Sequence, residues 1–143
     1  MGQSGDPRTA GELQNQFGVP NDHRVSLGQL GEELACAALQ RRGYAIIARR
    51  YRTRCGEIDV VARDGETIVF VEVKAKAGHT CGTAREAVTP RKRRQIISMA
   101  THYLARHRVG ADAVRFDVVA VTAVPGQEPL VEVIQNAFTL NDC

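Results

Sequence analysis

The chain has 143 residues, a length that fits one domain with a hydrophobic core of its own. No apolar run approaches the length of a membrane span and the N-terminus lacks a basic-then-apolar signal pattern, so we expect a soluble cytoplasmic protein with no membrane partner. The net charge is only +3, but 16 of the 19 basic residues are arginines, whose planar guanidinium suits phosphate recognition.

The first predicted regular element is a helix over 27–42. Residues 1–25 are polar and turn-rich without periodicity, so we expect a flexible tail, followed by one domain over 26–143. Ser26 is a suitable N-cap, Leu27, Leu30 and Leu34 recur at helical spacing, and Gly43 suits the C-terminal end.

Strands follow, interrupted by one further helix. A strand is expected over 44–51, then two strands within 56–74 joined at Asp64-Gly65, a strong hairpin signal between Val- and Ile-rich runs. A loop over 75–88 leads to Thr89 and Pro90, which suit the N-cap and first position of a helix reaching Arg108. Strands over 115–123 and 130–135 complete the chain.

The predicted order is therefore α-β-β-β-α-β-β, an α/β fold. The second helix stands between two strands, which implies one parallel pair in an otherwise antiparallel sheet flanked by helices.

The predicted hairpin places several charged residues together. A two- or four-residue loop at Asp64-Gly65 sets Asp59 opposite Phe70 and Glu57 opposite Glu72, so Glu57, Asp59, Glu72 and Lys74 share one face. Asp59 and Glu72 are then diagonal neighbours with Cα atoms about 7–8 Å apart, a gap that a cation can bridge. An odd loop length would separate the two carboxylates.

These acids have two interpretations. Charges within apolar strands cost stability unless they are paired or bind a metal, and the alternative to a site is a set of structural cross-strand Glu–Lys pairs. Hard oxygen ligands suit Mg²⁺ or Mn²⁺, which would activate a water molecule for phosphodiester hydrolysis while Lys74 positions that water. Glu32 or its neighbour Glu33 on the first helix can add a further carboxylate.

Two basic segments flank the acids. The first contains Arg49, Arg50, Arg52 and Arg54 around Tyr51, and the second contains Arg91, Lys92, Arg93 and Arg94 at the start of the second helix. With Lys76, they are the predicted nucleic-acid-binding residues, which would hold the phosphate backbone and read shape rather than sequence. Ordinary solvated surface charge is the alternative.

The motifs together resemble the YraN family, small bacterial proteins with a restriction endonuclease-like, or PD-(D/E)xK, fold. The resemblance covers about residues 27–138 and rests on the following short motifs: Gly31-Glu32, Gly43-Tyr44, Gly56-Glu57-Ile58-Asp59, Phe70-Val71-Glu72-Val73-Lys74, Lys92, Arg115-Phe116-Asp117 and Asn136-Ala137-Phe138. Two positions depart from the family pattern, Arg50 in place of Asn and Lys76 in place of Arg. Ile58 also stands where the superfamily name has Pro.

The resemblance implies an α-β-β-β-α-β nuclease core with an extra C-terminal strand, similar to archaeal Holliday junction resolvases. It implies metal binding by Asp59, Glu72 and Glu32, the last favoured over Glu33, with Glu57 and Lys74 completing the catalytic set. The expected function is a metal-dependent nuclease acting on structured or branched DNA. A catalytically silent nucleic-acid-binding protein and an interaction module remain alternatives. DNA is favoured over RNA, and a homodimer is left open.

Overall fold

The computed structural model describes residues 26–78, 88–107 and 113–139. The expected N-terminal tail and most of the expected loop over 75–88 lie outside this part of the chain. The helices are α2 (Leu27–Arg41) and α3 (Pro90–His107), and the strands are β1 (Ala45–Thr53), β2 (Gly56–Asp64), β3 (Thr67–Ala77), β4 (Ala113–Ala123) and β5 (Leu130–Phe138).

Both described helices begin where their capping residues predict. The Ser26 hydroxyl accepts a hydrogen bond from the Gln29 amide, and the Gln29 side chain accepts one from the Ser26 amide, which forms a capping box. The Thr89 hydroxyl accepts from the Lys92 amide, and Pro90 takes the first helical position of α3. Gly43 follows α2 with φ +94°, the left-handed conformation that ends many helices.

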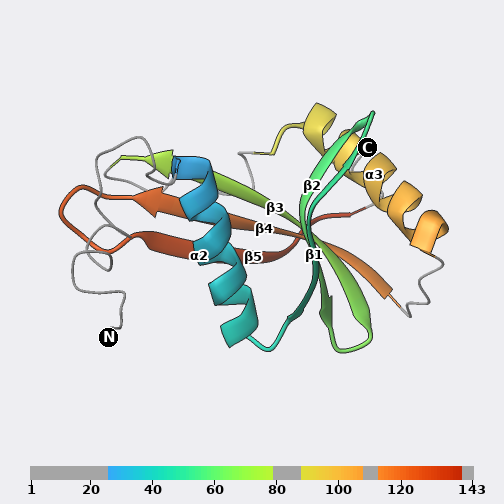
Figure 1. Ribbon diagram of the computed structural model, residues 1–143, viewed down its shortest axis with the longest axis horizontal. Helices are drawn as coiled ribbons and strands as arrows, with labels where there is room; N and C mark the ends of the chain where they lie inside the picture. The colour runs from blue at the N-terminus through green and yellow to red at the C-terminus, as the bar shows by residue number, and fades with distance from the viewer. Residues whose placement is uncertain (1–25, 79–87, 108–112, 140–143) are drawn as a thin grey trace, which may run out of the picture.

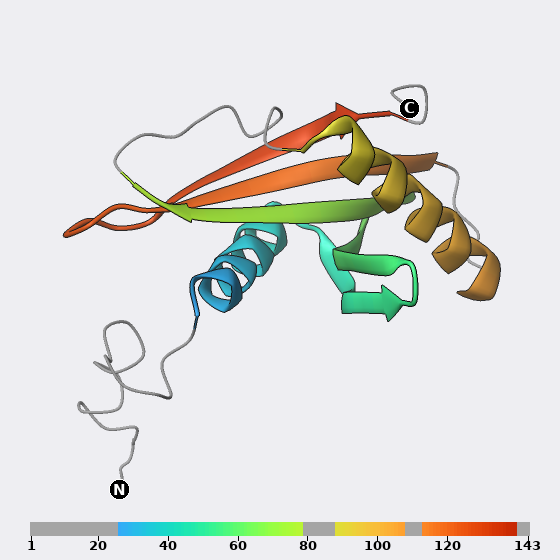
Figure 2. The same cartoon turned by 90° about the horizontal axis from the view of Figure 1, so that it is seen from above.

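The strands form one mixed sheet in the order β1-β2-β3-β4-β5 (Figure 1). Among the strands that the structure describes, only β3 and β4 pair in parallel, and the connection between them contains α3, so the predicted crossover is confirmed. The α/β order of the PD-(D/E)xK core plus one C-terminal strand is therefore present. Figure 2 shows β1 and β2 curving away from the long strands β3, β4 and β5.

Two hydrophobic clusters hold the helices to the sheet. One packs α3, through Ile96, Met99 and Tyr103, against Phe70 and Phe116. The other packs α2 against a different set of strand residues, which are Val60, Ala62, Val69, Val71, Val119 and Val121. Because neighbouring residues such as Val69 and Phe70 belong to different clusters, the two helices cover opposite faces of the sheet.

The predicted register of the β2–β3 hairpin is wrong by two residues. The observed pairs are Asp64↔Thr67, Arg63↔Ile68 and Val61↔Phe70, so the loop is Gly65-Glu66 instead of Asp64-Gly65. Gly65 has φ +63° and Glu66 does not have a positive φ, which is the pattern of a type II′ turn with Gly at its first position. A shift by two keeps every side chain on its predicted face, whereas a shift by one would have reversed them.

The sheet is interrupted at Asp59. The β2–β3 pairs end at Val60↔Val71, and between the β1–β2 pairs Arg49↔Val60 and Tyr51↔Ile58 lies Arg50, whose φ is +57°. Ile58 and Val60 pack in opposite cores, although residues two apart in a regular strand share a face. The chain therefore twists sharply at Asp59, where β2 leaves β3.

Candidate functional site

Asp59 and Glu72 converge at this interruption. The Val73 backbone amide donates a hydrogen bond to Asp59 Oδ2 at 2.8 Å. The Asp59 carboxylate therefore accepts the bond that a backbone carbonyl of β2 would accept in a continuous ladder, and this holds it beside β3. The Asp59 and Glu72 carboxyls lie close enough together for each to shift the pKa of the other. The sequence placed the pair diagonally, whereas continuation of the observed register sets them opposite each other.

The environment of the pair disfavours two negative charges. Burial, followed by the charge of Asp59, raises the pKa of Glu72 to about 7. Burial also raises the pKa of Asp59, against the opposing effect of the hydrogen bond from Val73. Two adjacent carboxyls in a partly desolvated place behave as one proton-sharing unit.

Two lysines approach Glu72 from different elements. Lys74 Nζ, two residues along β3, lies 3.6 Å from Glu72 Oε2, and Lys92 Nζ, in the first turn of α3, lies 3.9 Å from the same atom. Both lysine side chains are about one-third exposed or more, while the Glu72 side chain is 6% exposed. The lysines therefore bridge the buried acid and the surface.

Glu32 reaches the site from α2, which lies unusually close to β3. A Cβ on Gly31 would stand 2.7 Å from Ala75 Cβ, so only glycine permits this approach. Glu32 Oε1 accepts from Arg50 Nε at 2.8 Å and from Arg49 Nη2 at 3.4 Å. Glu33 was the alternative to Glu32 as the helix carboxylate of the site. Its side chain is 65% exposed and pairs with Arg49 at 3.1 Å.

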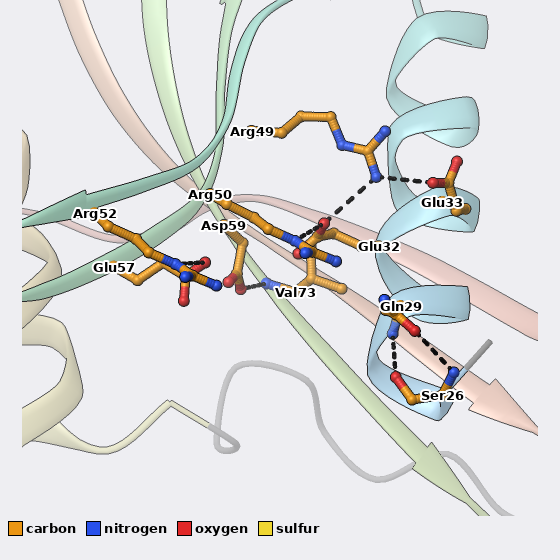
Figure 3. A network of polar contacts seen from close by, with 10 residues as sticks. All are labelled: Ser26, Gln29, Glu32, Glu33, Arg49, Arg50, Arg52, Glu57, Asp59 and Val73. Carbon is orange, nitrogen blue, oxygen red and sulfur yellow. Dashed lines mark hydrogen bonds and ion pairs between the residues drawn. The ribbon is translucent and has the colours of Figure 1, made fainter. Parts of the chain in front are cut away.

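Figure 3 shows how the arginines of β1 meet the acids. Arg50 extends to Glu32 beside Asp59, and Arg52 Nε lies 3.4 Å from Glu57 Oε2. Arg50 and Arg52 were predicted as nucleic-acid contacts, and in this structure each forms an ion pair with a predicted site carboxylate. The sequence contained no signal for the Arg50–Glu32 pair, because β1 and α2 are brought together only by packing, whereas Arg52 and Glu57 are directly opposite each other on the adjacent strands β1 and β2.

Two open grooves meet at Lys74. One, of about 460 Å³, is lined by the residues around the acids, including Ser26, Gln29, Glu32, Arg50, Arg52, Glu57, Asp59 and Lys74. The other, of about 500 Å³, is lined by Lys74, Thr89, Arg91, Lys92 and Gln95. The first, which contains the carboxylates and is called the acidic groove, and the second, the basic groove, thus share Lys74. No sequence pattern predicted that Gln95 or Gln29 would line them.

The remaining predicted nucleic-acid-binding residues are more dispersed. Arg54, Lys76 and Arg94 are exposed outside these grooves. Arg93 turns back, donating to the Val88 carbonyl at 3.0 Å and lying over the Phe138 ring at 5.7 Å. Of the four basic residues at the start of α3, therefore, Arg91 and Lys92 line the basic groove.

The carboxylates of the site meet part of what a divalent cation needs. Over 26–78, 88–107 and 113–139, no three His, Cys, Asp or Glu side chains stand close enough together to hold a metal ion. Asp59 and Glu72 do form an adjacent pair of oxygen donors with raised pKa values, and their mutual repulsion is what a cation relieves. The pair therefore fits a small hard cation such as Mg²⁺ or Mn²⁺, whereas Glu32 and Glu57 are held by Arg50 and Arg52.

A second acidic centre was not assigned a role by the sequence. Asp117 is fully buried in β4 and accepts from Arg115, from the Tyr44 hydroxyl at 2.8 Å and from the Asn136 amide at 2.9 Å. Arg115 also pairs with Asp64 at 3.0 Å, which ties the β2–β3 turn to β4. One structural network thus joins two of the motifs, Arg115-Phe116-Asp117 and Asn136-Ala137-Phe138.

Comparison with known proteins gives one family. The model of "Uncharacterised protein family UPF0102" matches residues 31–121, more than half of the chain. A UPF0102 protein from Geobacter metallireducens is 49% identical over 118 residues, covering 82% of this chain and 96% of its own length. Another from Anaeromyxobacter dehalogenans is 46% identical over 121 residues, covering 85% and 90%. No helix in the described part of the chain is long and apolar enough to cross a membrane.

Proposed function

The chain belongs to the UPF0102 family, as its resemblance to YraN proteins indicated, and we propose that it is a metal-dependent nuclease of the PD-(D/E)xK type acting on structured or branched DNA. The observation that carries this proposal is the Asp59–Glu72 pair. Two neighbouring, largely buried carboxyls with raised pKa values lie where the sheet opens, and Asp59 lines a groove.

A purely structural role explains this pair poorly. Burial of like charges side by side raises the free energy of the folded state, and a network that only stabilises the fold supplies enough donors to each acid. Asp117 has three such donors, whereas Asp59 accepts from the Val73 amide, Glu72 has two lysines at 3.6 and 3.9 Å, and the pKa of each acid is still raised. An unfavourable placement of like charges is typical of a site whose charges bind a ligand.

Each side chain has a distinct part in the proposed reaction. Mg²⁺ or Mn²⁺ would lower the pKa of a bound water and neutralise charge on the scissile phosphate. Asp59, oriented by the Val73 amide, and Glu72 would hold the cation. Lys74 lies next to Glu72 and lines both grooves, so it can orient the attacking water and stabilise negative charge on the phosphate.

The basic groove supplies a path for the DNA backbone. Arg91 and Lys92 lie on the first turn of α3, where the positive end of the helix dipole favours an anion. A phosphate in this groove would place the neighbouring phosphodiester near Lys74, which belongs to both grooves. Contacts of this kind read the backbone rather than the bases, which agrees with a substrate recognised by shape.

The proposal is tested by a cleavage screen over duplex, flap and four-way-junction DNA, with structured RNA for comparison, in Mg²⁺ or Mn²⁺. We expect cleavage of a structured DNA, and loss of at least about 100-fold in rate for Asp59→Asn, Glu72→Gln and Lys74→Met, since each removes a group used in the transition state. Glu33→Gln is the matched control, because it removes an exposed acid of α2 that pairs only with Arg49. Cleavage that survives all three substitutions would assign the activity to a contaminant.

One observation favours a second candidate, a nucleic-acid-binding protein without turnover. No described trio of acids forms a ready metal site, because Glu32 and Glu57 are paired with arginines. This candidate predicts DNA binding that weakens with salt through counterion release, with no cleavage of any substrate in either metal. Binding that does not change between low and moderate salt would count against both candidates.

A further inference from the structure

Arg50 has an unusual backbone and an unusual partner. Its φ of +57° lies in the left-handed region, which is strained for a non-glycine residue. Arg50 is skipped in the pairing of β1 with β2, and its side chain reaches Glu32 at 2.8 Å along the acidic groove, which both residues line. Arg50 is thus held in a strained position in which its guanidinium covers a predicted metal ligand.

Glu32 is otherwise well placed to join Asp59 and Glu72. Its helix is fixed against β3 by the close contact at Gly31, and its carboxylate is only 10% exposed. The charge of Glu32 is close enough to raise the pKa of Asp59. Arg50 therefore neutralises an acid of α2 whose charge acts on Asp59.

We propose that Arg50 is a phosphate-released latch on Glu32, an inference that rests on the proposed function. While the guanidinium holds Glu32, the site offers a cation only Asp59 and Glu72. When a DNA phosphate draws Arg50 away, Glu32 becomes the third carboxylate. Metal binding and nucleic-acid binding are then linked through one side chain, so that each strengthens the other.

The exposure and chemistry of Arg50 suit this role. Its side chain is 41% exposed and lines the acidic groove, so a phosphate can reach it without unfolding β1. Arginine binds phosphate in the same forked geometry that it uses for carboxylate, so the exchange of one anion for the other conserves its hydrogen bonds. Arg49 also contacts Glu32, but more weakly at 3.4 Å, and its shorter contact is with Glu33.

Mn²⁺ binding without nucleic acid, measured by calorimetry at constant ionic strength, tests the latch directly. Arg50→Asn removes the guanidinium and keeps a residue that adopts positive φ readily. We expect Arg50→Asn to bind Mn²⁺ about 10-fold more tightly than the wild type, and this gain to disappear in a Glu32→Gln background. Arg54→Asn is the matched control, since it removes the same charge from an exposed position nearby.

The outcomes separate the latch from the proposed function. A gain that persists with Glu32→Gln, or that Arg54→Asn reproduces, is a general charge effect and overturns the latch. No gain in Arg50→Asn, together with Mn²⁺ binding that Asp59→Asn abolishes, overturns the latch and leaves the nuclease proposal standing. No Mn²⁺ binding by the wild type or by Arg50→Asn overturns both.

The linkage itself is measured with a phosphorothioate oligonucleotide duplex, which resists cleavage. We expect this duplex to raise the Mn²⁺ affinity of the wild type about 10-fold and to have a much smaller effect on Arg50→Asn, because in that variant Glu32 is already free. An equal effect of the duplex on both proteins overturns the latch.

Discussion

The molecule contains two buried acidic centres that differ in how their charges are satisfied. Asp117, fully buried in β4, accepts hydrogen bonds from Tyr44, Arg115 and the Asn136 amide. Asp59 and Glu72, at the interruption of β2 and β3, lie close together and both have raised pKa values. The fold supplies Asp117 with hydrogen-bond donors, whereas Asp59 and Glu72 lie side by side despite the repulsion between their negative charges.

This difference separates a structural acid from a candidate functional one. Asp117 lies opposite Gln135, Asn136 and Ala137, where β5 bulges. Its carboxylate accepts a hydrogen bond from the backbone amide of Asn136, which the bulge leaves without a partner in the strand ladder. The Asp59 centre lies where β2 leaves β3 and opens to a groove. Burial of an acid therefore does not by itself identify a functional site. The hydrogen-bond donors around the acid distinguish a structural acid from a candidate functional one.

The largest effect is expected at the satisfied centre. Asp117→Ala leaves Tyr44 and the Asn136 amide without an acceptor, and we expect it to lower the free energy of unfolding by about 3–5 kcal/mol, as for other broken buried pairs. Asp117→Asn, which keeps one acceptor, should cost less. Urea unfolding measures both values, and a loss below about 1 kcal/mol for Asp117→Ala would contradict a structural role for this centre.

A smaller loss is expected when one donor of that centre is removed. The Tyr44 hydroxyl donates to Asp117 and accepts from Gln135 at 2.8 Å, so Tyr44→Phe leaves a buried acceptor with fewer donors. We expect a destabilisation of about 1–3 kcal/mol in thermal or urea unfolding. Tyr51→Phe serves as the control, since its hydroxyl meets only the exposed His102 at 2.8 Å.

At the other centre the same kind of substitution should stabilise the protein. Asp59→Asn retains an oxygen for the Val73 amide and removes one of two facing charges, so without metal we expect a gain of about 1 kcal/mol at pH 8. The variant should at the same time lose Mn²⁺ binding. A loss of stability as large as that of Asp117→Ala would show that the pair is structural.

The smallest effect is the pH dependence of that gain. A carboxyl whose pKa is raised in the folded state holds its proton longer when folded, so it lowers stability as the pH rises from its unfolded value toward about 7. The stabilisation by Asp59→Asn should therefore shrink from about 1 kcal/mol at pH 8 toward zero at pH 5. Unfolding measured at several pH values checks the trend, and a gain that grows toward acid pH would contradict the sign.

Local patterns in the sequence were sufficient for the element order. The caps at Ser26 and Thr89, the Val-rich strands and the Gly turn each depend on a few neighbouring residues, so they can be read without knowledge of the fold. The crossover helix also fixed the single parallel pair. The hairpin register was missed because Asp64-Gly65 and Gly65-Glu66 are both acceptable loops, and only the full sheet selects one.

The sequence by itself determined which residues carry charge near the hairpin and, through the period-two alternation of strands, that Asp59, Glu72 and Lys74 lie on one side. Only the tertiary structure decided what those charges meet. The approach of α2 at Gly31 brings Glu32 to Arg50, and the packing of α3 brings Lys92 to Glu72. Contacts between elements far apart in the chain depend on how helices pack on opposite faces of a sheet, which no local pattern encodes.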